Sequence, residues 1–500
     1  MSGRDGFGHV LRAEWTKLRT VRGWVFGLVA AALVIVLMGL FAAAASTVSC
    51  SGPDGKPCAG STPTRGPGGE PVVDAFSFAH RSFTGDGSIT ARVTSLSAVS
   101  SSDGGTPVAD TQPWTKGGVI IKESTTPGSP YAALTLTGGH GVRLQHNFTG
   151  DIAGTLDALP SWLRLTRSGD TITGHESADG GTWHLVGTVR LPGLPQTVRA
   201  GLFATSPHHE VLTESFASTS GTSYPTMATA EFDRIGLQGS WPDRTWTRGT
   251  VGGRGGGAVE VTADGVTVRG EGDIAPIVAG RGGLGKTVEG RLVGAFAGLI
   301  AVIVVAATFM TSEYRRGLIR TSLTASPRRG RVLAAKSAVI GAVTFVTGLV
   351  AALVAVPLVR AVEEDKGFFL FPVPTAVEVR VIVGTAALLS VAAVLSLAVG
   401  TVLRRSAGAV AVVIVAIVLP YILAIASVLP TGPSDWLLRI TPAAAFAVQQ
   451  SLPEYQQVTA SYAPADGYFP LSPLGGFAVL CGYAAVALGV AVFVLRRRDA

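Results

Sequence analysis

Charged residues are scarce in this chain of 500 residues. Asp, Glu, Lys and Arg together make up 15% of it, whereas a soluble globular protein carries about 25%. Hydrophobic residues reach 47% and gather in long runs that no charge interrupts. This composition excludes an ordinary soluble protein, and we predict an α-helical polytopic membrane protein.

Cysteine is also scarce, with three residues. Cys50 and Cys58 follow the first apolar run and form a candidate disulfide, although their spacing leaves open whether they are paired. Cys481 lies inside the last apolar run, where we expect it to pack as a small apolar side chain. No cluster with metal-ligand spacing and no catalytic triad is present, so we predict neither a metal nor a cofactor in this chain.

The net charge of +7 is distributed in a way that argues against nucleic-acid binding. Arg and Lys cluster at the ends of the apolar runs instead of forming a continuous basic stretch. Such clusters mark the cytoplasmic ends of membrane spans.

The central part of the chain predicts a membrane hairpin. An apolar run over 292–310 leads into a short connection, and a second apolar run follows Lys336. A bilayer core of ~30 Å takes roughly 20 apolar residues in a helix, and both flanks are long enough. The connection is rich in arginine, which places it in the cytoplasm. Its basic residues are Arg315, Arg316, Arg320, Arg328, Arg329 and Arg331.

Six apolar runs in all predict six transmembrane helices with both termini cytoplasmic and residues 46–287 extracellular, in the cell membrane. The predicted spans are 24–45, 288–310, 335–360, 379–403, 407–429 and 473–495. Between and around them we expect cytoplasmic segments at 1–23, 311–334, 404–406 and 496–500, and outer loops at 361–378 and 430–472.

The N-terminal 23 residues have apolar and basic side chains at helical spacing. They predict an amphipathic helix in the membrane interface, with Trp15 and Trp24 as anchors. The alternative is the charged start of a signal peptide. The apolar run that follows is long for that purpose, which favours an uncleaved first span.

An all-β domain is predicted between the first two spans. After a Gly- and Pro-rich linker at 46–70, residues 71–239 show many short segments of alternating polarity, and a Gly-rich extension follows at 240–287. This spacing predicts an inserted β-sandwich. No carboxylate pair has the spacing expected of a glycosidase, so a binding or spacer module is favoured over a hydrolase.

Four segments of the insert resemble concanavalin-like, jelly-roll β-sandwich domains of secreted sugar-binding and sugar-cleaving proteins. They are residues 85–93, 114–124, 177–183 and 198–203. The resemblance implies a fold more than an activity. Trp114, Trp162 and Trp183 are candidates for contact with a sugar ligand, and packing in the core is the alternative for each.

Residues Gly280–Thr287 match the pattern Gly-x4-Gly-Lys-Ser/Thr of a phosphate-binding loop. The predicted topology places the match outside the cell and directly before a membrane span, without an α/β domain around it. We therefore interpret it as a chance match in a Gly-rich stem, and we predict no enzyme activity in this chain.

The segment Thr311–Lys336 resembles the first cytoplasmic loop of type-2 ABC exporter permeases, and the segment Arg12–Thr20 resembles their N-terminal interfacial helix. In that family the loop couples to a separate ATPase subunit, which holds ATP and Mg²⁺, and two permease halves form the pore. The resemblance implies a permease homodimer or heterodimer in the lipid bilayer. By it the coupling residues are Glu313, Arg315, Arg316, Arg320, Arg328 and Arg329.

Two functions therefore stay open. The first is an exporter permease whose outer domain receives or guides a cell-surface substrate, such as a glycan. The second is a membrane-anchored carbohydrate-binding or sensory protein, in which the spans are only a scaffold. The large insert departs from the short outer loop of the family, and the sequence does not identify a substrate. For the first function, the plain alternative for the basic connection is that it only sets topology and contacts lipid phosphates.

Overall fold

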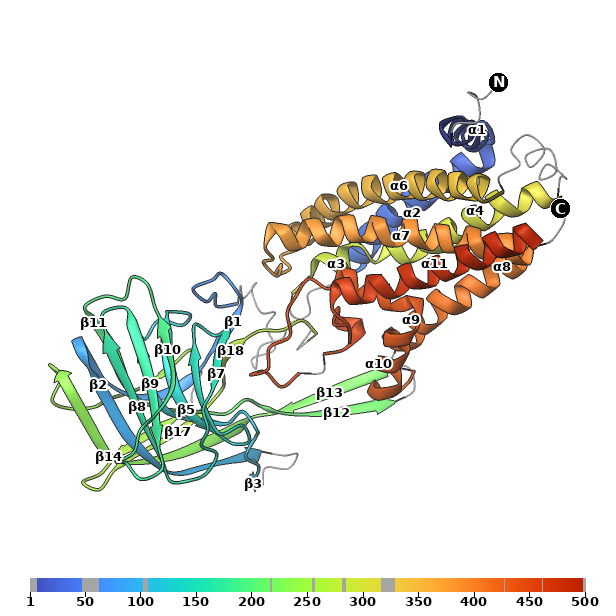
Figure 1. Cartoon of the computed structure of the whole chain (residues 1–500). Coiled ribbons are helices and arrows are strands. Elements are labelled where there is room, and N and C mark those ends of the chain that lie inside the picture. Colours follow the sequence, from blue (N-terminus) through green and yellow to red (C-terminus); the bar gives the residue numbers. More distant parts are fainter. Residues whose placement is uncertain are drawn as a thin grey trace.

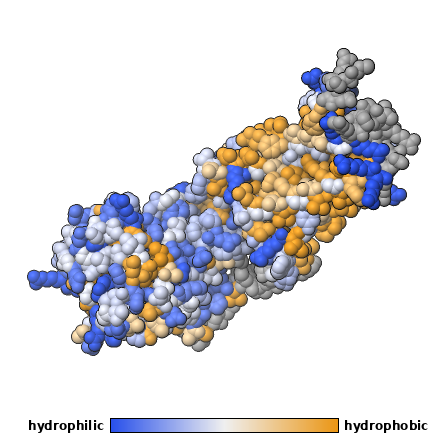
Figure 2. Space-filling view, in the orientation of Figure 1, coloured by the Kyte–Doolittle hydropathy of each residue, from blue (hydrophilic) through white to orange (hydrophobic). Residues whose placement is uncertain are grey.

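A computed structural model describes the chain at residues 7–46, 63–101, 107–215, 218–253, 257–280, 285–315, 329–426, 428–460 and 462–497. A bundle of long helices and an all-β domain lie end to end (Figure 1). Hydrophobic side chains cover the visible face of the bundle, whereas hydrophilic ones cover most of the β domain (Figure 2). Cys50, Cys58, Arg316, Arg320 and Arg328 lie outside the described residues.

Among the described residues, six helical segments are long and apolar enough to cross a membrane, so the prediction of six such helices is confirmed. They are α2 (Arg22–Ala45), α4 (Gly294–Arg315), α6 (Arg329–Asp365), α7 (Thr375–Leu403), the run of α8 (Ser406–Val413), η2 (Ile414–Val418) and α9 (Leu419–Ile425), and α11 (Pro473–Arg497). Shorter helices are α1 (Phe7–Thr20), α3 (Val288–Arg291), α10 (Thr431–Ile440), η3 (Pro442–Gln449) and η4 (Pro464–Asp466).

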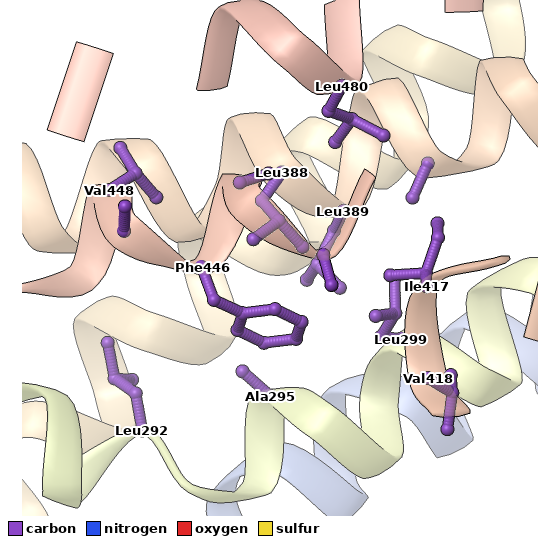
Figure 3. Close-up of a cluster of buried hydrophobic side chains, with 14 of the residues drawn as sticks. Leu292, Ala295, Leu299, Leu388, Leu389, Ile417, Val418, Phe446, Val448 and Leu480 are labelled. Atoms are coloured by element: carbon purple, nitrogen blue, oxygen red, sulfur yellow. The ribbon is translucent and has the colours of Figure 1, made fainter. Parts of the chain in front are cut away.

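The helices pack around α7 and η3. All eight residues of η3 are buried, and this short helix contacts both α7 and α11. Its Phe446 lies between Ala295 of α4 and Leu388 of α7 in the apolar core (Figure 3). The helix η3 is therefore part of the apolar core of the bundle.

The β domain lies between α2 and α3 in the sequence. Its main sheet is antiparallel, with the order β10-β9-β8-β2-β11-β4-β5-β6-β7 and further strands attached at β2 and β17. The strands are β1 (Val72–Asp74), β2 (Phe76–Ser101), β3 (Pro107–Ala109), β4 (Lys116–Lys122), β5 (Tyr131–Thr137), β6 (Val142–His146), β7 (Gly150–Ala153), β8 (Ser161–Ser168), β9 (Thr171–Ser177), β10 (His184–Arg190), β11 (Thr197–Thr205), β12 (His209–Ser215), β13 (Ser218–Tyr224), β14 (Thr226–Ser240), β15 (Thr247–Val251), β16 (Ala258–Val261), β17 (Val266–Glu271) and β18 (Ile274–Pro276).

Strand β2 joins the two halves of this sheet. Its residues 77–84 pair with β11, and its residues 87–93 pair with β8. Between them Gly85 and Gly87 have φ values of +68° and +152°, which side chains with a Cβ rarely adopt. The sheet turns at this point and packs on itself around one apolar core that includes Phe83, Leu134 and Leu165.

The strands that enter and leave the domain, β1 and β18, pair with each other. Two buried ion pairs fix them to β4: Lys122 Nζ lies 2.8 Å from Asp74 Oδ2, and Lys116 Nζ lies 2.8 Å from Asp273 Oδ1. Burial lowers the pKa of Lys122 in spite of the nearby Asp74. We call β1, β18 and the residues that follow β18 up to Ala279 the neck of the domain. Ion pairs that are buried from water therefore hold the domain at its neck.

The neck packs against two loops of the helical part. Val278 and Phe371 share an apolar cluster with Val458 and Tyr468. The Tyr468 hydroxyl accepts a hydrogen bond from the amide of Ala279 at 3.2 Å. The loop between η3 and α11 thus holds the base of the β domain, so the two parts of the chain are in direct contact.

Breaking the neck ion pair at one partner should destabilise the β domain. We expect Asp74→Asn to cost about 3–5 kcal/mol, because Lys122 is left buried without its counter-charge. Adding Lys122→Met should restore part of that loss. The measurement is denaturant unfolding of the detergent-solubilised full chain, followed by tryptophan fluorescence.

The matched control is Glu260→Gln, which removes an ion pair to Arg269 whose side chains are 49% and 61% exposed. An exposed pair contributes about 0–1 kcal/mol. Equal effects of Asp74→Asn and Glu260→Gln would contradict the assignment of the neck pair as a structural element.

Candidate functional site

The end of the helical bundle farthest from the β domain carries both chain termini (Figure 1). Hydrophilic side chains return there, beyond the apolar surface of the bundle (Figure 2). Helix α4 ends at Arg315 and α6 begins at Arg329, so the two ends of the basic connection belong to neighbouring elements of this region. The guanidinium of Arg329 donates to the carbonyl of Leu495 at 2.6 Å, which ties the start of α6 to the last turns of α11.

Four charged side chains meet at this end, and we call them the ion cluster: Glu14, Lys17, Glu313 and Lys336. The ammonium of Lys336 lies 2.6 Å from Glu14 Oε2 and 2.7 Å from Glu313 Oε1. Lys17 contacts the same two carboxylates at 2.8 and 3.0 Å. The cluster joins three elements: α1, the end of α4 and the third turn of α6.

The ion cluster is largely shielded from water. Lys336 is fully buried, and Glu14 and Glu313 are 2% and 4% exposed. The ring of Phe309 covers the Lys336 ammonium at 4.4 Å, a cation–π contact. Two carboxylates around one buried ammonium compensate the loss of hydration that an isolated charge would suffer.

Lys17 closes the cluster on its exposed side, where 38% of its side chain is accessible. Burial lowers its pKa, but the hydrogen bonds and charges of Glu14 and Glu313 outweigh burial and raise the pKa above 10.5. A lysine with a raised pKa contributes its stabilisation below that value and loses it only as the pH rises through the folded pKa. Lys17 therefore keeps its charge and its contribution to the cluster at neutral pH.

Local sequence explains how α1 presents these groups. Glu14 and Leu18 are one turn apart and are the buried residues of α1. Leu18 enters an apolar cluster with Met310 and Leu333. Trp15 is 45% exposed, whereas Trp24 packs edge-on against Phe309 with ring centroids 4.9 Å apart. Burial of one narrow stripe keeps α1 against the ends of α4 and α6.

The predicted coupling residues that the structure describes lie in different environments. Glu313 is buried in the ion cluster, and Arg329 contacts α11. Arg315 is the last residue of α4. Sequence reasoning did not single out Glu14, Lys17 or Lys336. A usable signal existed for two of them, because Lys336 begins an otherwise apolar run and Glu14 is the only acid in a basic helix.

The three candidate tryptophans also differ. Trp114 is 4% exposed and stacks on His140 with ring centroids 4.1 Å apart, so it packs in the domain. Trp162 and Trp183 are half-buried on the outer face of β8–β10. The side chains of Arg92 and Arg164 lie over their rings.

The described residues of the phosphate-binding-loop match at Gly280–Thr287 make contacts within the protein. Lys286 donates to Ser46 Oγ at 3.1 Å and lies over the ring of Phe368. Thr287 caps the short helix α3 by accepting from the amide of Gly290. Residues 281–284 lie outside the described part. Within the part that is described, no group of three His, Cys, Asp or Glu side chains is placed to hold a metal ion.

The six long apolar helices define a multi-pass membrane protein. Residues 124–500 match the model of the ABC-2 family transporter proteins, and the chain belongs to this family. It is therefore a permease component without an ATPase site of its own. Permeases of this family pair with ABC ATPase subunits, which are separate from the membrane component.

No curated protein matches the chain. Among solved structures, a functionally unknown protein from Saccharomyces cerevisiae is 16% identical, with a TM-score of 0.21, and the match covers 33% of this chain and 74% of that one. A GH43 protein, the BlXynB mutant from Bacillus licheniformis, is 15% identical over 24% of each chain, with a TM-score of 0.17. SCP-B, an Eqolisin peptidase, is 10% identical over 41% of this chain and 100% of its own, with a TM-score of 0.23.

The ion cluster allows a matched comparison of two lysines that contact the same carboxylates. We expect Lys336→Met to destabilise the solubilised protein by about 3–5 kcal/mol, since Glu14 and Glu313 then face each other in a dry site. Lys17→Met should cost about 1 kcal/mol or less, because water screens the exposed lysine. Thermal unfolding in detergent measures both.

Adding Glu14→Gln to Lys336→Met should recover part of the loss by removing one of the two like charges. If Lys17→Met destabilises the protein as much as Lys336→Met, burial is not what makes the cluster important.

Proposed function

We propose that this chain is the permease subunit of an ATP-driven exporter and that a cytoplasmic ATPase acts on it through the connection 311–334. The observation that carries the proposal is the ion cluster. It joins Glu313, at the start of the connection, to Lys336, just after it, at 2.7 Å. Glu14 of α1 contacts Lys336, and Lys17 of α1 contacts Glu313. A connection with its two ends joined conveys a force to α4 and α6 together.

In this proposal Glu313 positions the connection, and the arginines contact the partner. Buried carboxylates are poor docking groups because a partner cannot reach them. Arginine suits the task, since its guanidinium forms paired hydrogen bonds with carboxylates on another protein. Arg315, Arg316, Arg320 and Arg328 are thus the proposed contact residues, with Arg329 holding the start of α6 against α11.

We also propose that the end of the bundle with the ion cluster is cytoplasmic and that the β domain is extracellular. Arg404, Arg405, Arg496 and Arg497 stand at helix ends of the same side as Arg329, in line with the charge rule for cytoplasmic ends. The β domain lies at the opposite end of the bundle (Figure 1). Trp15, exposed on α1, would then anchor this helix at the inner surface of the membrane.

The β domain is proposed to receive or guide a cell-surface substrate. Its direct contact with the helical part of the chain supports a role in transport over a passive attachment. Gln457 of the last long loop donates to the carbonyls of Phe148 and Thr149 at 3.1 and 3.2 Å, in addition to the apolar neck. A membrane-anchored sugar-binding or sensory protein remains the second candidate, and a concanavalin-like origin of the domain is compatible with both. We propose a dimer of permeases, either homodimeric or heterodimeric, as the transport unit.

The coupling proposal predicts a loss of ATPase stimulation in Arg316→Ala/Arg320→Ala. Each lost charge-assisted hydrogen bond is worth about 1.5–3 kcal/mol. Stimulation by the permease should therefore fall at least tenfold in liposomes that contain the partner ATPase. The control is Arg248→Ala in β15, an exposed arginine far from the connection.

Expression and thermal stability of the double variant should equal those of the wild type, which separates loss of contact from misfolding. Undiminished stimulation by Arg316→Ala/Arg320→Ala would refute the proposed contact.

The topology proposal predicts opposite labelling of two exposed positions in whole cells. In a background with the native cysteines changed to serine, Thr188→Cys in β10 should react with a membrane-impermeant maleimide, and Arg19→Cys in α1 should react only after permeabilisation. Both native side chains are exposed, so access to reagent depends on the side of the membrane. The reverse labelling pattern would overturn the proposed orientation.

A further inference from the structure

The outer face of β2, β8, β9 and β10 carries an arginine that pairs with no carboxylate among the residues that the structure describes. Burial alternates along β8: Leu163 and Leu165 face the core, whereas Trp162 and Arg164 face outward. Arg164 stands opposite Thr90 of β2 and opposite His175 of β9. These side chains form an outward platform, which we define as Thr90, Arg164, His175 and Trp183.

Arg164 is held in place but not neutralised. Its Nε donates to Thr90 Oγ1 at 3.1 Å, and its guanidinium lies 3.7 Å from the ring centroid of Trp183. Among the described residues, no carboxylate is paired with it, and burial is what lowers its pKa. The two remaining guanidinium nitrogens therefore keep donors and a positive charge for a ligand.

Its neighbour Arg92 shows the contrasting case. Arg92 lies over the other outer tryptophan, Trp162, and pairs with Asp233 of β14 through two hydrogen bonds. Trp162 is also covered by Gly180, where an added Cβ would lie 2.7 Å from the indole. That half of the face is satisfied internally, so Arg164 supplies the positive charge of the platform.

His175 adds a second polar group without a partner. Within the described part of the chain, its buried Nδ1 has no hydrogen-bond partner. Burial, and then the charge of Arg164, lower its pKa. A buried polar atom without a partner costs free energy, so the surroundings of Arg164 on this face are polar and incompletely satisfied.

We propose that this platform binds an anionic carbohydrate, with a carboxylate or phosphate on Arg164, beside His175, and a sugar ring against Trp183. Charge complementarity selects the anion. The half-exposed indole offers an apolar surface for the C–H face of a pyranose, and Leu185 extends it at 61% exposure. An open pleated face suits an extended polymer better than an enclosed small molecule. The inference rests on the proposed exposure of the β domain at the cell surface.

The test is binding of fluorescent saccharides to the full-length protein in detergent. Three probes separate the sources of charge: oligogalacturonate, its methyl ester and poly(glycerol phosphate). We expect one or both anionic probes to bind, with affinity falling as salt is raised, and the neutral ester to bind at least tenfold more weakly. Preference between the two anions tells carboxylate from phosphate.

Arg164→Gln should weaken the bound anion at least tenfold. Arg190→Gln, which removes an exposed arginine from the neighbouring strand β10, should leave binding unchanged. Circular dichroism of Arg164→Gln should match the wild type; if it does not, Arg164→Lys, which keeps the charge, serves in its place and should weaken binding less than tenfold.

Absence of binding by both anions, or equal binding by wild type and Arg164→Gln, would overturn the proposal. These outcomes are independent of ATPase coupling and of orientation in cells, because the assay uses purified protein without a partner. Failure here is therefore distinguishable from failure of the proposed function.

Discussion

The ammonium of Lys336 sets the geometry of the membrane part. A buried lysine is tolerated only where opposite charges replace its hydration, and here two carboxylates from two other elements do so at 2.6 and 2.7 Å. If either α1 or α4 moved away, Lys336 would lose one of its two counter-charges while it remained buried from water. Apolar packing of Leu18 and Met310 brings these elements together, but it would allow them to slide. The ion cluster fixes their register.

A second ion pair repeats this arrangement at the other end of α6. Glu363 accepts from Arg291 of α3 at 2.8 Å, and both side chains are 4% exposed. Lys336 and Glu363 are 27 residues apart in one helix, or about 40 Å. Helix α6 is thus joined by buried ion pairs to the segment α3–α4 near both of its ends. These two pairs link α6 to the segment α3–α4 both beside the proposed cytoplasmic connection and at the end nearer the β domain.

How far sequence predicts this structure depends on the range of the interactions. The spans follow from composition, because a run such as 292–310 must be helical in a bilayer. Alternating polarity gave the β-rich nature of the insert, since one face of each strand is buried. The ion cluster depends on pairs such as Lys336 and Glu14, which are 322 residues apart, and no local pattern encodes that contact. The burial of Trp114, in contrast to the half-burial of Trp162 and Trp183, likewise depends on tertiary contacts such as its stacking on His140.

The charges within and beside the spans also bear on where the energy for transport enters. A proton-coupled transporter needs ionisable groups that change partner or protonation during the cycle. In the described part of the bundle, Lys336, Glu313, Arg291 and Glu363 instead form close ion pairs. Removing one partner from such a pair costs about 3–5 kcal/mol. These groups are therefore poorly suited to carry protons during transport, and they stabilise the packing of the helices instead. Helices that are joined by such ion pairs are expected to move together when a force acts on one of them. In the proposed function, a separate ATPase applies that force at the basic connection between α4 and α6.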